Sequence, residues 1–497
     1  MIDKRRSKQT MNYARITLIV LAIAMTSALG CGSNDREASS EAKESLERGW
    51  TAFIEGLEEA RGEIEDPWLT GPDPSERDLA DGYRYLLGHV VRIAETEFGQ
   101  HVDLPYFQRS VRMMSKWTID NPDTLYLSAP IDPAGTYRIR ARAADSQDWH
   151  TSKRTRIYPK APRLVTFQTT TATIGDTGEL NEFATCRNQT LGFVQGFEIF
   201  PDHDGRFEIL VAPSKPANYR GHFLPTRGSV ECAPRDKEPF MLEREATNIA
   251  VREIFSNWDA EVPIDLEIER IDTNTNIRPP LNAEETAQRL EAIGVKLPNQ
   301  IRFWNALHEF GLEVLGDRNL DGKRALPENA LNPAAPPFIA GGTAGARQLY
   351  SAGTFNLEDD QALILRVETK VDPHYVGFQL ANFWGESLDQ ASYTSSLTGG
   401  QLPRQRDGAR YYVVTARDPG VPGWLDPTGL PEGAMSMRFV YNEDPAEKDF
   451  PVITSTLTTF DQIREHLPED TVTVSSEKRR TQIARRQAHI RKRWRQY

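Results

Sequence analysis

The sequence predicts a mainly β protein with two antiparallel β-sandwich domains, a helical segment before the first and a helical linker between them. Regions 101–275 and 346–465 consist of short β-branched and aromatic runs separated by Gly, Pro, Asn and Asp, a pattern typical of antiparallel strands and turns. Regions 46–100 and 276–345 instead carry apolar residues at helical spacing. A chain of 497 residues is long enough for two cores.

Residues 1–30 have the three parts of a lipoprotein-type signal peptide: a basic start, the apolar run ITLIVLAIAM and the small-residue stretch TSALG. The apolar run is too short to span a bilayer. Ala28-Leu29-Gly30-Cys31 resembles a bacterial lipoprotein cleavage box, in which the cysteine is lipidated; the alternative is a plain secretory signal. We therefore predict a cell-envelope protein anchored through Cys31 to the outer membrane, facing the periplasm or the exterior.

Residues 31–45 are polar and predict a flexible tether. Two amphipathic helices follow within 46–100. The first places four apolar residues on one face, Leu46, Trp50, Phe53 and Leu57. We expect both helices to form a brace packed against the β domains.

Cysteine usage predicts one disulfide. If Cys31 is lipidated, Cys186 and Cys232 remain as an even pair in an oxidising compartment. The alternative is two buried free thiols.

The linker 276–345 contains the sharpest local pattern, DRNLDGKRALPE. Its oxygen ligands and glycine have the spacing of an EF-hand calcium loop, with Asp317, Asn319, Asp321 and Glu328 as the predicted ligands. The following NALNPAAPPF cannot form the second helix of an EF-hand, so a loop of Asx turns is the alternative. No other cofactor is expected.

Two groups of residues are candidates for function. Asn121-Pro122-Asp123-Thr124 forms either a tight turn before a strand or the edge of a site, with Tyr126 beside it. The second group lies at strand ends and turns of the C-terminal domain: Asn382, Trp384, Asp389, Asp418, Trp424 and Asp426. As structure, these residues would cap turns and fill the core.

The runs YVGFQLANFWGESLD and DPGVPGWLDPTG, with LPENALNP and QALILRVE, resemble the bacterial family catalogued as domain of unknown function 1214. NPDTLYLSAPID, GTYRIRAR and REIFSNWD resemble the N-terminal β portion that accompanies it. The resemblance implies jelly-roll-like sandwiches, similar in architecture to bacterial glycan amidases, and no established reaction. Gly423 departs from the family, which more often has Asn there. The family motif LPENALNP would also explain Glu328 without calcium.

The net charge is -12, yet nine basic residues and no acidic ones lie in the last twenty residues. An acidic body argues against nucleic-acid binding. Within 471–497, Ile483, Ile490, Trp494 and Tyr497 recur at helical spacing among the basic residues. This pattern predicts an amphipathic tail helix on anionic lipid; a disordered tail is the alternative.

No phosphate-binding glycine loop, zinc spacing or G-x-S-x-G elbow is present. We therefore predict a binding protein for a polysaccharide or another extracytoplasmic ligand, contacted by Tyr126, Asn382 and exposed rings of Trp384 and Trp424. The alternative is a hydrolase of glycans or glycoconjugates that uses paired carboxylates, with candidates Asp123, Asp389, Asp418 and Asp426.

Overall fold

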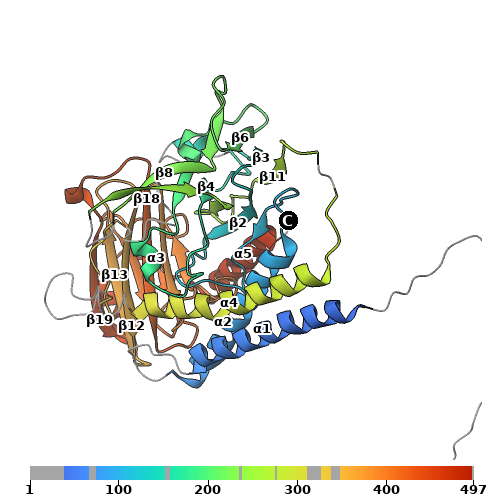
Figure 1. Cartoon of the computed structure of the whole chain (residues 1–497). Coiled ribbons are helices and arrows are strands. Elements are labelled where there is room, and N and C mark those ends of the chain that lie inside the picture. Colours follow the sequence, from blue (N-terminus) through green and yellow to red (C-terminus); the bar gives the residue numbers. More distant parts are fainter. Residues whose placement is uncertain are drawn as a thin grey trace, which may run out of the picture.

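The computed structural model describes residues 38–65, 74–150, 157–233, 238–274, 277–309, 326–336 and 347–494. It confirms the predicted fold class, because the protein is mainly β and its strands form two sandwiches (Figure 1). The predicted signal peptide and Cys31 lie outside the described residues. Of the helices described, none is both long enough and apolar enough to cross a bilayer.

The first sandwich has a five-stranded and a four-stranded sheet. The larger sheet contains, in spatial order, β1 (Gln108–Arg109), β2 (Thr124–Pro130), β10 (Asn248–Ile254), β4 (Leu164–Thr170) and β5 (Thr190–Gln195). The smaller sheet contains β11 (Asp265–Arg270), β3 (Tyr137–Arg142), β6 (Arg206–Ala212) and β7 (His222–Pro225). A separate hairpin is formed by β8 (Arg227–Cys232) and β9 (Phe240–Glu245).

Alternation explains these strands. In β3, Tyr137, Ile139 and Ala141 are buried while the intervening arginines face outward, the two-residue period of a half-buried strand. The inward residues of both sheets form one continuous apolar core. The predicted disulfide is also present, between Cys186 and Cys232.

The second sandwich consists of two four-stranded sheets. One contains β12 (Arg347–Asn356), β18 (Glu432–Tyr441), β14 (Tyr375–Ala381) and β15 (Ser396–Thr398). The other contains β17 (Trp424–Leu425), β16 (Arg410–Val414), β13 (Gln361–Glu368) and β19 (Val452–Thr459). Strand β14 pairs antiparallel with β18 on one side and β15 on the other.

Three long helices form a layer at the lower edge of Figure 1: α1 (Ser40–Glu65), α2 (Glu76–Ala94), which continues into η1 (Glu95–Gly99), and α4 (Ala283–Glu309). Helices α1 and α4 run parallel, since Arg48 pairs with Glu284 near their starts and Glu63 with Arg302 near their ends. The helices approach closely because small residues line the crossing: a Cβ on Gly56 would lie 2.0 Å from the Gly294 carbonyl oxygen.

Helix α1 of the predicted brace does not bury the face that the sequence predicts. Helix α1 buries Ser45, Gly49, Gly56, Ala60 and Ile64. The predicted inner face is partly exposed, with Trp50 56% exposed. Close packing on α4 explains the difference, because it needs small side chains.

The C-terminal helix α5 (Ser476–Trp494) packs into the protein. Ile490 is buried in the core of the first sandwich, and Arg479, Arg486 and Arg493 are buried on the same side of the helix. The prediction that Ile490 faces lipid is therefore wrong: the arginines of this face find backbone oxygens inside the protein. The remaining short helices are η2 (Gln147–His150), α3 (Asn181–Ala184), η3 (Gly196–Glu198), η5 (Glu447–Asp449) and η6 (Phe460–His466).

Candidate functional site

The Asn-Pro-Asp-Thr motif lies buried between the two sandwiches, directly before β2. The Asn121 side chain accepts a hydrogen bond from the Asp123 amide at 3.0 Å, and the Thr124 amide donates to the Asn121 carbonyl at 3.0 Å. Asn121 therefore closes the turn as an Asx turn. The Asp123 carboxylate is not used for capping and faces the second sandwich.

The Asp123 carboxylate is 1% exposed and accepts a 2.6 Å hydrogen bond from the Tyr375 hydroxyl of β14. Burial raises the pKa of Asp123, against the opposing effects of Tyr375 and nearby arginines. Its Oδ1 atom has no hydrogen-bond partner among the described residues. Glycine is required at Gly377, because a Cβ there would lie 2.9 Å from Asp123 Oδ2 and closer still to the Tyr375 hydroxyl.

Arg493 of α5 reaches the same place from the C-terminus. Its Nη1 donates to the Pro122 carbonyl at 2.6 Å and its Nε to His489 Nδ1 at 3.0 Å. The guanidinium lies 4.6 Å and 4.4 Å from the rings of Phe255 and Trp258. Burial lowers the pKa of Arg493, while the Asp123 carboxylate raises it. The helix thus places a cation against the motif.

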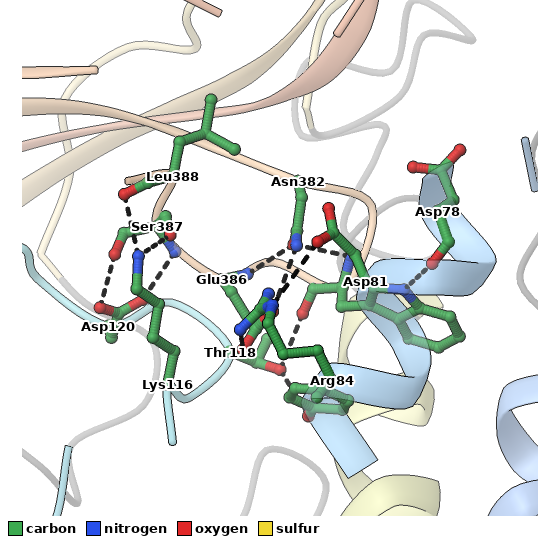
Figure 2. Close-up of polar contacts among 12 residues, drawn as sticks. Asp78, Asp81, Arg84, Lys116, Thr118, Asp120, Asn382, Glu386, Ser387 and Leu388 are labelled. Carbon is green, nitrogen blue, oxygen red and sulfur yellow. Dashed lines mark hydrogen bonds and ion pairs between the residues drawn. The ribbon is translucent and has the colours of Figure 1, made fainter. Parts of the chain in front are cut away.

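A second polar cluster joins the segment before β2 to the second sandwich (Figure 2). Lys116 Nζ donates to the carbonyls of Ser387 and Leu388 and, at 3.1 Å, to Gln390 Oε1. Asp120 accepts hydrogen bonds from the amide and the hydroxyl of Ser387, each at 2.7 Å. Burial lowers the pKa of Lys116, and Asp120 raises it.

Glu386 connects this cluster to α2. Its carboxylate is fully buried, pairs with the Arg84 guanidinium and accepts a hydrogen bond from Asn382 Nδ2 at 3.2 Å (Figure 2). Burial raises the pKa of Glu386, and the Arg84 charge lowers it. Every charged group of this cluster contacts another polar group. We call the buried polar residues between the two sandwiches the interdomain layer, which comprises the Asn121–Thr124 motif, Tyr375 and the cluster of Lys116, Asp120 and Glu386. This layer holds α2, the segment before β2 and the second sandwich together.

The predicted ligand-binding residues divide between two places. Asn382, Trp384 and Tyr126 join the interdomain layer, where the Tyr126 hydroxyl accepts from the Asn121 amide at 2.9 Å. Trp384 is 3% exposed, stacks on Tyr85 and donates to the Asp78 carbonyl at 2.8 Å. Its predicted role as an exposed binding ring is therefore wrong.

Trp424 is also buried, at 8% exposure, and its Nε1 donates to the Thr415 carbonyl at 2.8 Å. The prediction of an exposed ring is wrong here too. Both indoles fill apolar clusters because each N–H reaches a backbone carbonyl, which removes the cost of burying it.

Three of the four candidate catalytic carboxylates cap turns. Asp389 accepts from the amides of Ala391 and Ser392, at 2.8 and 3.0 Å. Asp426 accepts from the Thr428 amide at 2.7 Å. Asp418 accepts from the Gly420 amide at 2.9 Å and forms an ion pair with Arg479.

Asp426 and Asp418 differ in their surroundings. Burial raises the pKa of Asp426, the hydrogen bond from the Thr428 amide lowers it, and the charge of Asp418 makes a smaller contribution that raises it. Asp418 borders an open depression of about 350 Å³ on α5, lined also by Arg479, Arg480 and Gln487. Asp123 and Asp389 contribute nothing to this lining.

Three of the four predicted calcium ligands, Asp317, Asn319 and Asp321, lie outside the described residues. Glu328 is described and exposed. Within the described ranges, no group of His, Cys, Asp and Glu side chains could hold a metal ion. The calcium loop stays a prediction.

No family model and no curated protein matches the chain. The chain is similar to the crystal structure of an uncharacterized protein from Burkholderia cenocepacia, with TM-score 0.65 and 21% identity, over 85% of this chain and 100% of that one. The VPA0106 protein of Vibrio parahaemolyticus matches with TM-score 0.36 and 12% identity, over 75% of this chain and 98% of that one. The first likeness supports the fold alone, and the resemblance to domain of unknown function 1214 stays a prediction.

Sequence reasoning missed Arg84, Lys116, Glu386 and Arg493. Each is a single charged residue within an amphipathic or turn-rich stretch, where a solvated position is the default. No local signal marked Glu386 for burial, because its neighbour Trp384 was itself predicted to be exposed.

Proposed function

We propose that the protein is a cell-envelope lipoprotein that binds a polysaccharide through an aromatic surface on the first sandwich. The observation that carries this proposal is the stack of Phe200 on His150, with ring centroids 4.2 Å apart and planes at 2°. Phe200 is 74% exposed, more than any other Phe, Tyr or Trp of the described residues. A flat, solvent-facing ring held by a second ring is a surface on which the apolar face of a sugar can stack.

Polar groups lie next to this stack in the chain. The turn after Phe200 is fixed by Asp202, whose carboxylate accepts from the amides of Asp204 and Arg206, each at 2.9 Å. His203 at its tip is exposed and able to hydrogen-bond sugar hydroxyls. The surface therefore combines an apolar ring with the few polar groups that orient a glycan.

The predicted location has independent support. The disulfide between Cys186 and Cys232 fits an oxidising compartment outside the cytosol. Lipidation of Cys31 would hold the protein at the membrane with no contribution from the buried face of α5. Cell fractionation tests this part: Cys31→Ser should release the protein from membranes, and a variant that stays membrane-bound would contradict lipid anchoring.

Glycan binding is tested with the purified protein on a polysaccharide array, followed by calorimetry on each glycan bound. Phe200→Ala should weaken binding about tenfold, which corresponds to losing about 1.4 kcal/mol from one stacking ring. Phe240→Ala is the matched control, because Phe240 is an exposed phenylalanine on the separate hairpin. No glycan bound, or equal affinity for both variants, would contradict the proposal.

Hydrolysis is the second candidate, and two observations favour it: the raised pKa of the half-buried Asp426 and the place of Asp418 at an open depression. Asp426, with its raised pKa, would be the acid, and Asp418, held by Arg479, the anionic partner. If so, the protein releases reducing ends from a bound glycan and Asp426→Asn abolishes the release, while Asp389→Asn keeps it. Binding without release of reducing ends would leave the binding function alone.

A further inference from the structure

The side of α5 that faces solvent is strongly basic. Three buried arginines, Arg479, Arg486 and Arg493, recur every seven residues and mark the side that packs into the protein. After Glu477 in its first turn, α5 contains no acidic residue. The exposed side carries five basic residues, which we call the basic helix face: Lys478, Arg480, Arg485, Arg491 and Lys492.

Carboxylates of the protein neutralise little of this face. Within the described part of the chain, one member forms an ion pair, Arg485, which lies 3.3 Å from Asp259. Asp418, which lines the depression on α5, is already held by two hydrogen bonds from the buried Arg479, at 2.9 and 3.0 Å. The chain as a whole has a net charge of -12. An unpaired positive surface is thus an exception on this molecule, and it attracts anions.

The depression of about 350 Å³ gives this face a concave part. Arg480 and Gln487 line it together with the apolar side chains of Ile483 and Ala484. Arg491 lies four residues beyond Gln487 and therefore continues the same side of the helix. A cation, an amide and a small apolar surface are the groups that bind and orient a sugar ring bearing a carboxylate.

Compartment and shape favour an acidic polysaccharide over other polyanions. The disulfide between Cys186 and Cys232 fits a compartment outside the cytosol, which argues against a nucleic acid. A helix that lies on anionic lipid buries apolar side chains in the membrane. In α5, Ile490 is instead buried in the protein, and no large apolar side chain of its described residues is exposed. A concave surface also fits a single polymer chain better than a flat bilayer.

We propose that the basic helix face binds an acidic polysaccharide, whose anionic groups pair with Arg480, Arg491 and their basic neighbours. The proposal rests on the proposed function for the class of ligand, and it adds a second surface and the charge of the polymer. The two surfaces consist of different residues, so each can be tested without the other.

Calorimetry of the purified full chain with polygalacturonate tests the proposal, and fully methyl-esterified polygalacturonate is the uncharged control polymer. The wild type should bind the acid and not the ester. Arg480→Gln with Arg491→Gln should weaken binding about tenfold, because two exposed charge pairs are lost. Lys215→Gln with Arg220→Gln is the matched control: it removes the same charge from exposed positions between β6 and β7 and should leave the affinity unchanged.

A second measurement needs no variant. The affinity of the wild type for polygalacturonate should fall steeply between about 0.05 and about 0.5 M salt, because salt screens exposed charges. No binding of polygalacturonate, equal binding of acid and ester, or equal affinity of the two double variants overturns the proposal.

Two further outcomes separate this surface from its alternatives. Binding that is lost in Phe200→Ala and kept in Arg480→Gln with Arg491→Gln overturns the proposal and leaves the aromatic surface as the glycan site. The reverse result supports the basic helix face even if the aromatic surface binds no glycan. Binding to phosphatidylglycerol vesicles that the Arg480/Arg491 variant loses, without binding of polygalacturonate, overturns the proposal in favour of lipid.

Discussion

The hydroxyl of Tyr375 donates a 2.6 Å hydrogen bond to the carboxylate of Asp123, joining β14 of the second sandwich to the loop before β2 of the first. Burial raises the pKa of both groups. The hydrogen bond from Tyr375 lowers the pKa of Asp123, whereas the charge of Asp123 raises the pKa of Tyr375 further. The contact is one of several side-chain hydrogen bonds that join the two domains, and Lys116 and Asp120 form others with the loop around Ser387. Removing the Tyr375 hydroxyl therefore tests how much one such bond contributes.

Tyr375→Phe should lower the free energy of unfolding by about 3 kcal/mol, because it leaves a buried carboxylate without its donor. Urea unfolding at pH 7 measures this loss. Tyr412→Phe is the matched control: Tyr412 is a buried tyrosine of the same sandwich whose hydroxyl has no hydrogen-bond partner in the described part of the chain. Its removal should cost less than about 1 kcal/mol. Equal losses in the two variants would mean that the Asp123 contact contributes nothing specific.

Glu253 of β10 should make stability fall as pH rises. Burial raises its pKa from 4.5 to about 8, so the folded state binds more protons than the unfolded state between these two values. The free energy of unfolding should then decrease across that window, by up to about 1.4 kcal/mol per pH unit. This loss of stability is absent below pH 4.5 and complete above about pH 8.

Urea unfolding at pH 5, 7 and 9 checks this dependence against Glu253→Gln, which removes the titrating group. The free energy of unfolding of Glu253→Gln should increase relative to that of the wild type as pH rises. Glu267→Gln on the exposed side of β11 is the control and should keep the wild-type slope. Parallel pH profiles for wild type and Glu253→Gln would show that Glu253 does not titrate in this window.

The sequence was sufficient for the fold class because strand alternation is local: Tyr137, Ile139 and Ala141 are buried exactly as their two-residue spacing indicates. It was insufficient for Trp384 and Trp424, because a tryptophan at a turn has the same local signature whether it is buried or exposed. Their burial depends on carbonyl groups of Asp78 and Thr415, the first of them more than 300 residues away in the chain.

The same limit explains the basic tail. Apolar residues at helical spacing among basic ones predict an amphipathic helix, but the pattern does not show whether Arg486 and Arg493 bind lipid phosphates or carbonyl groups of the protein. In the fold, the carbonyl oxygens of Gln390 and Pro122 accept from these arginines. The partners of these arginines depend on tertiary contacts, and no local sequence pattern contains that information.

Arg84→Ala should lower the free energy of unfolding by about 3–5 kcal/mol, because it leaves the fully buried Glu386 carboxylate without its cation. Glu386→Gln in the same chain removes that charge, so the double variant Arg84→Ala/Glu386→Gln should recover a large part of the loss. Chemical denaturation of the wild type, both single variants and the double variant gives the coupling. Additive losses would mean that the two side chains are not coupled.

Gly56→Ala tests the crossing of α1 and α4. The added Cβ would lie 2.0 Å from the Gly294 carbonyl oxygen, and backbone must move to admit it. We expect a loss of about 2 kcal/mol or more, since overpacking a rigid contact commonly costs 1–3 kcal/mol. Gly62→Ala is the matched control six residues further along the same helix, where no atom lies within 4 Å of the new methyl group. There the higher helix propensity of alanine should raise stability by up to about 1 kcal/mol. The two substitutions are chemically identical, so opposite signs in thermal or urea unfolding can come only from the helix contact. A gain in both variants would contradict the close parallel packing of α1 on α4 that turns Trp50 outward.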